Sequence, residues 1–302
     1  KSALGAGSAI TAGLGGGQNP FFWYTGASSA SSNRTWNFQS SATTIVAQNG
    51  SLLLSGNFNG VTANAGSSIV LAGTADTGIN EISGAITDPS GSSTTLQISN
   101  STPQGGTAES GFWILSGNSS YTGTTSLNSA SILRIAHANA LGSTANGTSV
   151  ATGSALELTG GISVGAEALS LSGTGISNGG GLRNISGNNS YAGVITLGAA
   201  TRINSDANTL TLSSNITGTY GLTIGGAGNT IISGNITTST GTLDKDGKGT
   251  LTLTGNNTYS GVTTISAGTL AIDGSGQLGG GSYSGNIANA GTFLYNGTNS
   301  QT

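Results

Sequence analysis

The stretch that decides the fold lies near the end of the chain, where residues 249–270 read GTLTLTGNNTYSGVTTISAGTL. Its middle part, LTGNNTYSG at 253–261, occurs twice more in nearly the same form. The two other copies are LSGNSSYTG at 115–123 and ISGNNSYAG at 185–193, and a looser copy, LSGN, surrounds Gly56. Self-similarity of this kind indicates a repeat architecture, in which each copy is one structural unit.

The residues around these copies predict strands. Apolar and polar side chains alternate in TLTLT at 250–254 and in TLTL at 209–212, which is the period of a strand with one buried face. Gly, Asn, Ser and Asp, which favour turns, separate such segments. We therefore expect an all-β fold. The side chains expected to point inward are Leu251, Leu253, Ile265 and Leu270, and those expected to point outward are Thr250, Thr252 and Thr254.

A shorter unit is nested inside the long one, because Ser-Gly-Asn at Gly234 echoes the full copy that follows at Gly255. Short strands recurring at about twenty residues are typical of a solenoid of stacked parallel coils. The chain length predicts about 13–14 turns. We expect the solenoid over residues 41–302, with long repeats near 56, 117, 187 and 255. A sandwich or barrel of antiparallel hairpins is the alternative all-β interpretation, but it gives no reason for the repeat spacing.

Composition agrees with stacking and limits the partners. The 302 residues include 54 Gly, 7 Lys plus Arg and 10 Asp plus Glu, with a net charge of −3. Like charges at equivalent positions of stacked coils would repel, whereas Thr, Ser and Asn stack without that cost. So few basic residues argue against nucleic acid as a partner, and no apolar run is long enough to insert into a membrane. The absence of Cys excludes disulfides and thiol chemistry.

The stretch 249–270 closely resembles the autotransporter-associated β-strand repeat, which occurs in the passenger regions of bacterial autotransporters and in related large surface proteins. Residues 138–142 and 153–158 look like further turns of the same pattern. The resemblance is strong over about 110–302 and weak before that. It implies a right-handed parallel β-helix, export to the cell exterior or surface, and a structural or adhesive role. The repeat unit of this family carries no catalytic residues, so none is transferred.

Several motifs invite a chemical interpretation, and each is better explained as a turn. The only histidine, His137, lacks the partners of a catalytic triad. Residues 244–247 (DKDG) resemble part of a calcium loop, but its third ligand and later Glu are missing. Glycine clusters at 13–17, 179–181 and 279–281 lack the following helix of a phosphate cradle. We predict no catalytic, cofactor or metal site, and no cofactor.

Aromatic residues provide the remaining candidate sites. An aromatic cluster lies within residues 1–40, which we interpret as an N-terminal extension with a cap or an end-to-end assembly contact; carbohydrate binding is the alternative. Its members are Phe21, Phe22, Trp23, Tyr24, Trp36 and Phe38. Three tyrosines share one repeat position and either cover the edge of the core at a corner or contact a sugar polymer. They are Tyr121, Tyr191 and Tyr259.

The leading functional hypothesis is a non-enzymatic extracellular β-solenoid that serves as a stalk, an adhesin shaft or a fibre subunit. Both chain ends look unfinished, from which we expect either head-to-tail assembly with another copy or excision from a longer protein. A carbohydrate-binding or polysaccharide-degrading β-helix is one alternative, although the acidic residues are isolated along the sequence. An ice-binding solenoid with Thr-X-Thr rows is another. Expected partners are the chain itself and cell-surface or matrix polysaccharide.

Overall fold

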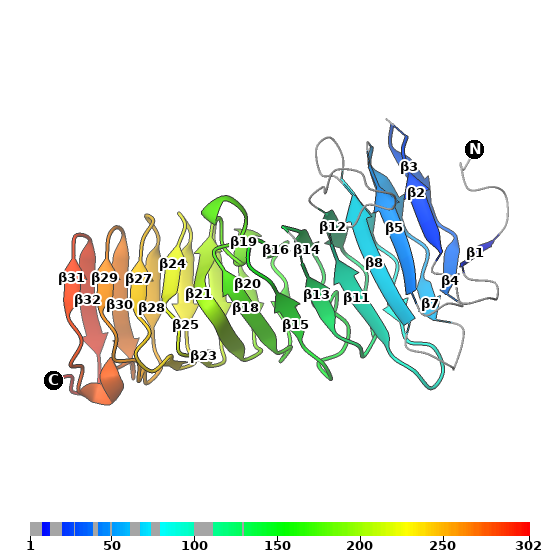
Figure 1. The fold of residues 1–302 in the computed structure, drawn as a ribbon. Coiled ribbons are helices and arrows are strands. Elements are labelled where there is room, and N and C mark those ends of the chain that lie inside the picture. Colours follow the sequence, from blue (N-terminus) through cyan, green and yellow to red (C-terminus); the bar gives the residue numbers. More distant parts are fainter. Residues whose placement is uncertain are drawn as a thin grey trace. The chain divides into compact units, whose positions relative to one another are not determined.

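Parallel strands stacked in coils make up the fold, a β-solenoid with about 11 coils and no α-helix among the described residues (Figure 1). The computed structural model describes residues 8–12, 20–26, 28–38, 42–48, 50–60, 67–73, 79–99, 111–128 and 130–302. Within them, no helix has the length and apolar character needed to cross a membrane. The chain divides into two compact units, residues 1–149 and 150–302, which are described separately.

In the first unit, successive coils contribute one strand to each of three parallel stacks. The first stack is β1 (Ala9–Ala12), β4 (Thr35–Phe38), β7 (Phe58–Gly60) and β10 (Ile86–Thr87). The second is β2 (Phe21–Tyr24), β5 (Ala42–Ala47), β8 (Ser67–Gly73), β11 (Thr94–Ile98) and β13 (Thr125–Leu127). The third is β3 (Ala30–Ser32), β6 (Leu52–Leu54), β9 (Glu81–Ile82), β12 (Phe112–Leu115) and β14 (Ile132–Ile135). β15 (Thr148–Val150) spans the division between the units.

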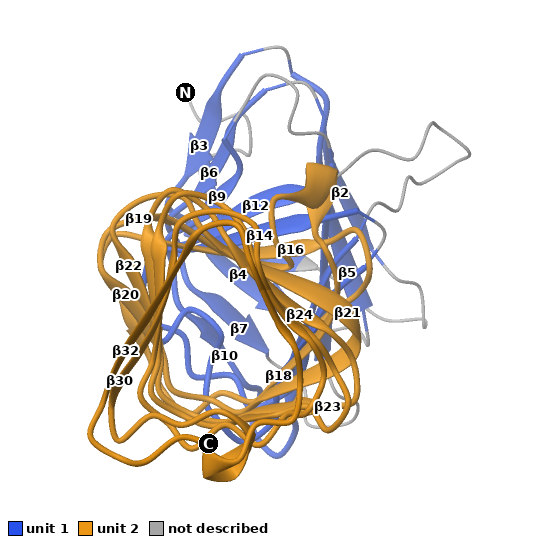
Figure 2. Cartoon of the chain, turned by 90° about the vertical axis from the view of Figure 1, so that its left-hand side faces the viewer, with its two compact units in different colours: residues 1–149 blue, residues 150–302 orange. Residues whose placement is uncertain are grey.

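In the second unit, the coils superpose when viewed along their stack (orange in Figure 2). One stack is β17 (Ser163–Val164), β20 (Asn189–Tyr191), β22 (Thr209–Leu212), β25 (Asn229–Ile232), β28 (Thr250–Leu253), β30 (Thr269–Gly274) and β32 (Thr292–Gly297). Another is β16 (Ala155–Thr159), β19 (Leu182–Ser186), the second half of β21 (Ile195–Ser205), β24 (Leu222–Gly225), β27 (Leu243–Lys245), β29 (Thr263–Ile265) and β31 (Ile287–Asn289). The third is β18 (Leu169–Gly173), the first half of β21, β23 (Ile216–Gly218) and β26 (Ile236–Thr237). Two short 3₁₀ turns, η1 (Ile176–Asn178) and η2 (Gly279–Gly281), lie in the connections.

The coils are longer on average than the sequence suggested, which is why there are about 11 and not 13–14. In the middle of the second unit the step between coils is short, since Leu182 pairs in register with Ile203. In the third stack of the first unit two successive steps are longer, from Leu53 to Glu81 and from Glu81 to Ile114. Longer connections, not longer strands, account for the difference.

Part of the predicted N-terminal extension belongs to the stacked coils. The strands β2, β3 and β4 lie within residues 1–40 and pair in parallel with β5, β6 and β7. The boundary at residue 40 stays a prediction, whereas the division seen between compact units falls after Ser149.

The core follows the predicted register. The four leucine and isoleucine side chains expected to point inward, Leu251, Leu253, Ile265 and Leu270, are fully buried. The three alternating threonines, Thr250, Thr252 and Thr254, are only partly buried. Alternation within β28 thus places its leucine side chains inside the coil and its threonine hydroxyl groups toward the outside.

Candidate functional site

The repeated Gly-Asn motif forms a clamp between coils. In the three full copies, the polar side chain at the second position after the motif glycine accepts a hydrogen bond from the backbone N–H of an isoleucine in the preceding coil. The pairs are Ser119 with Ile86 (3.1 Å), Asn189 with Ile162 (2.7 Å) and Asn257 with Ile236 (2.9 Å). All three clamp side chains are buried, so these bonds satisfy backbone groups away from water.

In the last copy, one amide joins three successive coils. The Asn257 Oδ1 atom accepts the Ile236 N–H of the preceding coil, while Nδ2 donates to the carbonyl of Gly255 at 2.9 Å. Nδ2 also donates to the carbonyl of Gln277 in the following coil at 3.0 Å. Asn is suited to this position because its amide carries both an acceptor and two donors.

The motif glycine allows the backbones of neighbouring coils to approach at the corner. A Cβ atom at Gly117 would lie 2.2 Å from the Gly84 carbonyl oxygen, and one at Gly255 would lie 2.3 Å from that of Gly234. Gly187 has a φ of 86°, a conformation that other residues rarely adopt. Any side chain at these positions would push adjacent coils apart.

The motif tyrosines fill the corner from inside. Tyr121, Tyr191 and Tyr259 are fully buried, so their rings do not face solvent or a polymer on the surface. The hydroxyl of Tyr121 bonds with that of Thr125 at 2.6 Å, and the hydroxyl of Tyr259 bonds with that of Thr263 at 2.8 Å. Burial raises the pKa of Tyr259 above its usual value.

The N-terminal aromatic cluster separates into exposed and buried members. Phe21 and Trp23 on β2 are 56% and 44% exposed, and their strand neighbours Phe22 and Tyr24 are partly buried. Trp36 and Phe38 belong to the core of the first unit. The ring of Trp36 is edge-on to that of Phe22 at 5.1 Å and stacks on that of Phe58 at 5.6 Å.

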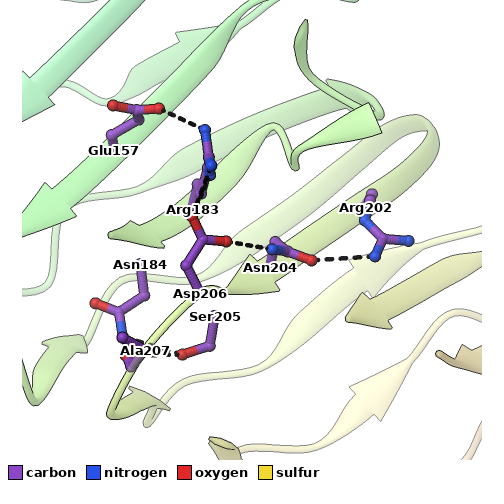
Figure 3. Close-up of polar contacts among 8 residues, drawn as sticks. All are labelled: Glu157, Arg183, Asn184, Arg202, Asn204, Ser205, Asp206 and Ala207. Carbon is purple, nitrogen blue, oxygen red and sulfur yellow. Dashed lines mark hydrogen bonds and ion pairs between the residues drawn. The ribbon is translucent and has the colours of Figure 1, made fainter. Parts of the chain in front are cut away.

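The second unit also contains a charged column that the sequence did not reveal (Figure 3). Glu157 on β16 pairs in register with Arg183 on β19, which pairs in register with Asn204 on β21. The Arg183 guanidinium lies 3.1 Å from Glu157 and 2.6 Å from Asp206. Burial acts to lower the pKa of Arg183, but the hydrogen bonds and charges of Asp206 and Glu157 outweigh it and raise the pKa. No sequence motif links Glu157, Arg183 and Asp206, because each of the three lies in a different coil.

A second arginine continues the column. The Arg202 guanidinium binds both carboxylate oxygens of Asp246 at 2.7 Å and donates to the side chain of Asn204 at 3.1 Å. Arg202 and Asp246 lie in two coils that are separated by a third coil, which contains Gly225. A Cβ atom at Gly225 would lie 2.0 Å from Arg202 Nη2. The missing side chain at Gly225 therefore provides the space for the ion pair.

A short insertion covers part of this column. Residues 174–181, the strap, contain η1, and the strap includes Ser177 and Asn178 with φ of 49° and 60°. The Gly181 N–H donates to the Arg202 carbonyl at 2.9 Å, and a Cβ at Gly180 would lie 2.9 Å from that of Asn204. The glycine cluster at 179–181 thus allows the strap to lie close to the outer face of the sheet.

Comparison with protein families identifies the repeat. The passenger-associated-transport-repeat matches residues 109–132 and 243–272, which contain the first and third copies of the clamp. The chain therefore carries autotransporter passenger-like repeats at these two stretches. No match was found among curated proteins or among solved structures. Passenger repeats are generally structural and non-catalytic, and the family implies a secreted or surface-exposed domain.

The DKDG segment of this passenger-like repeat protein is part of the coil stack. Lys245 is buried on β27, where its Nζ donates to the carbonyls of Asp246 (2.7 Å), Gly247 (2.9 Å) and Ala267 (3.3 Å). Burial lowers the pKa of Lys245 despite the nearby charge of Asp246. Among the described residues, no group of three or more potential metal ligands occurs.

The other candidate motifs lie in turns of the passenger-like repeat protein. His137 Nδ1 accepts the Asn139 N–H at 3.1 Å within one turn. The glycine cluster at 279–281 forms η2. The cluster at 13–17 lies outside the described residues.

Proposed function

We propose that this passenger-like repeat protein is a non-enzymatic extracellular shaft, serving as the stalk of an adhesin or as a fibre subunit. The observation that carries the proposal is the Asn257 amide, which bonds to three successive coils. The most recognisable side chains of the repeat thus hold neighbouring coils together and are not exposed to a substrate. A passenger repeat whose motif residues are used in this way is suited to rigid extension.

The charged groups also support a role without catalysis. Hydrolysis of a glycosidic bond generally needs two carboxyl groups about 5–10 Å apart, one of which can protonate the leaving group. In the charged column, Glu157 and Asp206 both bind Arg183, and Asp246 binds Arg202. These carboxylates are therefore engaged in ion pairs within the coil stack.

The proposal includes head-to-tail assembly with a second copy. Phe21 and Trp23 are exposed on β2, while Ile287, Leu294 and Tyr295 are exposed on β31 and β32. These last strands border a cavity of about 360 Å³ that is lined in part by aromatic rings. Because the two surfaces differ, a contact between them would be heterologous and would propagate as a filament unless the rotation closes a ring.

Two measurements test the shaft proposal. Purified protein is incubated with a panel of neutral and acidic polysaccharides, and new reducing ends and unsaturated products are measured against a heat-denatured sample. Immunogold electron microscopy locates the chain on the cells that produce it. We expect no product and label at the cell surface or in the extracellular matrix. Product formed only by the native protein, or label confined to the cytoplasm, would contradict the proposal.

A further inference from the structure

One outer face of the second unit presents a row of hydroxyl side chains along successive coils. Ser170 on β18 pairs in register with Thr196 on β21, which pairs with Thr217 on β23, which pairs with Thr237 on β26. The Thr258 N–H donates to the carbonyl of Ile236 at 2.9 Å, which continues the row into a fifth coil. These five residues are here called the hydroxyl row, and β18 and β23 mark their side of the unit in Figure 2.

The hydroxyl row is ordered by contacts to the strands beneath it. The Thr217 hydroxyl donates to the carbonyl of Ile195 at 3.4 Å, and the Thr237 hydroxyl donates to that of Ile216 at 3.3 Å. Thr196 and Thr217 also contact each other through their hydroxyl oxygens at 3.2 Å. A hydroxyl that donates to the backbone keeps acceptor capacity for a ligand, and the rungs repeat at about 4.8 Å. None of these five side chains is buried.

The strands of the row carry no charged side chain. No Asp, Glu, Lys or Arg occurs in residues 168–173, 194–200, 213–220, 233–241 or 254–261, and Glu167, in the turn before β18, is buried. An anionic ligand would therefore find no cation there. A ligand that matches this face must be neutral, must offer both donors and acceptors, and must repeat along one axis.

An exposed tyrosine lies in the turn after β23. Tyr220 is three residues beyond Thr217 and is 46% exposed. A Cβ atom at Gly241 would lie 2.2 Å from the Tyr220 carbonyl oxygen, so Gly241 lies next to the Tyr220 backbone in the following coil. An exposed tyrosine presents an apolar face with a polar tip, the combination that suits a ring with both C–H and hydroxyl groups.

We propose that the hydroxyl row and Tyr220 bind a neutral polysaccharide that lies along the stacked coils. Each rung of the protein offers the same hydroxyl group, and each sugar unit offers the same hydroxyl groups in return. A single hydroxyl contact contributes little to the affinity. Once one sugar unit is bound, however, the next unit of the same polymer is held at a high local concentration near the next hydroxyl, so repeated contacts add up. The site goes beyond the shaft function and does not depend on it, since the clamp and core side chains are buried inside the coil whereas the row lies on its outside.

The test uses affinity electrophoresis of the full chain in gels containing a neutral soluble glucan, such as dextran or a mixed-linkage β-glucan, with alginate as the acidic comparison. One variant is Tyr220→Ala. A second combines Thr196→Val, Thr217→Val and Thr237→Val, which keeps shape but removes the hydroxyls. The matched control, Thr211→Val with Thr252→Val, makes the same change on β22 and β28 in another stack. Circular dichroism and thermal unfolding confirm that each variant folds.

We expect at least one neutral glucan to retard the wild-type chain, with little effect of salt. Both face variants should bind about tenfold more weakly, which corresponds to about 1.4 kcal/mol, and the control should bind like the wild type. The proposal is overturned if no neutral glucan binds, if only alginate binds, or if the face variants bind like the control. It is also overturned if the face variants change only self-association or ice-growth inhibition. None of these results would affect the shaft proposal, whose own tests are enzymatic activity and location.

Discussion

The buried side chain of Asn257 makes three hydrogen bonds that together join three successive coils, which makes it the most informative residue for stability. Asn257→Ala removes one acceptor and two donated hydrogen bonds, leaving the Ile236 N–H and two carbonyls without this partner. We expect the free energy of unfolding to fall by about 2–4 kcal/mol, because buried polar groups lose their partner and a small cavity forms. Chemical denaturation measures the change.

The neighbouring Asn256 provides the control for this prediction. Its side chain is exposed, so Asn256→Ala should change the free energy of unfolding by less than about 0.5 kcal/mol. Equal losses for the two variants would show that the clamp contributes nothing of its own.

Tyr259 gives stability a dependence on alkaline pH. Burial raises its pKa above the usual 10.0, so above pH 10 the unfolded chain releases the phenolic proton while the folded chain retains it. The stability that the buried, protonated Tyr259 contributes is therefore fully present below pH 10 and is lost as the pH rises further. Tyr259→Phe should cost about 1 kcal/mol at neutral pH through the lost bond to Thr263, and should make stability fall less steeply above pH 10.

Denaturant unfolding at pH 8 and at several values above pH 10 checks this prediction. The control is Tyr220→Phe, which alters an exposed ring and should keep the wild-type alkaline slope. If the free energy of unfolding falls as steeply with pH in Tyr259→Phe as in the wild type, groups other than Tyr259 cause the loss of stability at alkaline pH.

At the scale of the element, β24 leaves a gap at its last residue for an ion pair from neighbouring coils. Gly225→Ala would place a Cβ 2.0 Å from Arg202 Nη2 and 2.4 Å from Asp246 Oδ1. We expect it to destabilise the wild-type chain by about 1–3 kcal/mol, because the pair must separate or the strand must shift.

A double-mutant cycle isolates this effect. In an Arg202→Met background the guanidinium is gone, so Gly225→Ala should cost less than about 0.5 kcal/mol. The two free energies of unfolding are compared by denaturant titration. Additive losses would mean that the glycine is required by its own backbone and not by the ion pair.

The register of β28 is tested by a pair of adjacent substitutions. Leu253 is fully buried and Thr252 is partly exposed. Leu253→Asp should cost several kcal/mol, since an unpaired carboxylate would enter the core, and Thr252→Asp should cost much less. Differential scanning calorimetry compares the two variants. Equal melting temperatures would contradict the register.

At the scale of the whole molecule, the proposed assembly depends on exposed aromatic rings. Phe21→Ser combined with Trp23→Ser removes the two exposed rings of β2 and leaves the buried Trp36 and Phe38 in place. If β2 takes part in a head-to-tail contact, the double variant should remain folded and monomeric at concentrations at which the wild type associates. Sedimentation velocity and negative-stain microscopy measure this.

The control for assembly is Tyr220→Ser, which removes an exposed ring from a different coil. It should associate like the wild type. A wild-type chain that stays monomeric at every concentration would remove head-to-tail assembly from the proposed function.

The sequence by itself determined the features that depend on short-range patterns. Alternation in 250–254 predicted which side chains are buried, and the repeated motif predicted stacked parallel coils. Both predictions hold because a strand has a side-chain period of two and because identical corners require identical residues. The resemblance carried by 249–270 led to the same family that matches at 243–272.

Only the tertiary structure decided which residues of different coils lie side by side. Far fewer residues separate Leu182 from its partner Ile203 than separate Glu81 from its partner Ile114. The number of residues per coil varies, so the sequence position of a residue does not show which residue lies beside it in the next coil. The charged column and the hydroxyl row therefore leave no sequence motif. For the motif tyrosines the sequence favoured a position covering the core edge and left contact with a polymer as the alternative, and only the structure shows that they are fully buried in the corner. The direction of a side chain is set locally, by the alternation within its strand. Which residues of two coils become neighbours depends instead on the length of every turn between them.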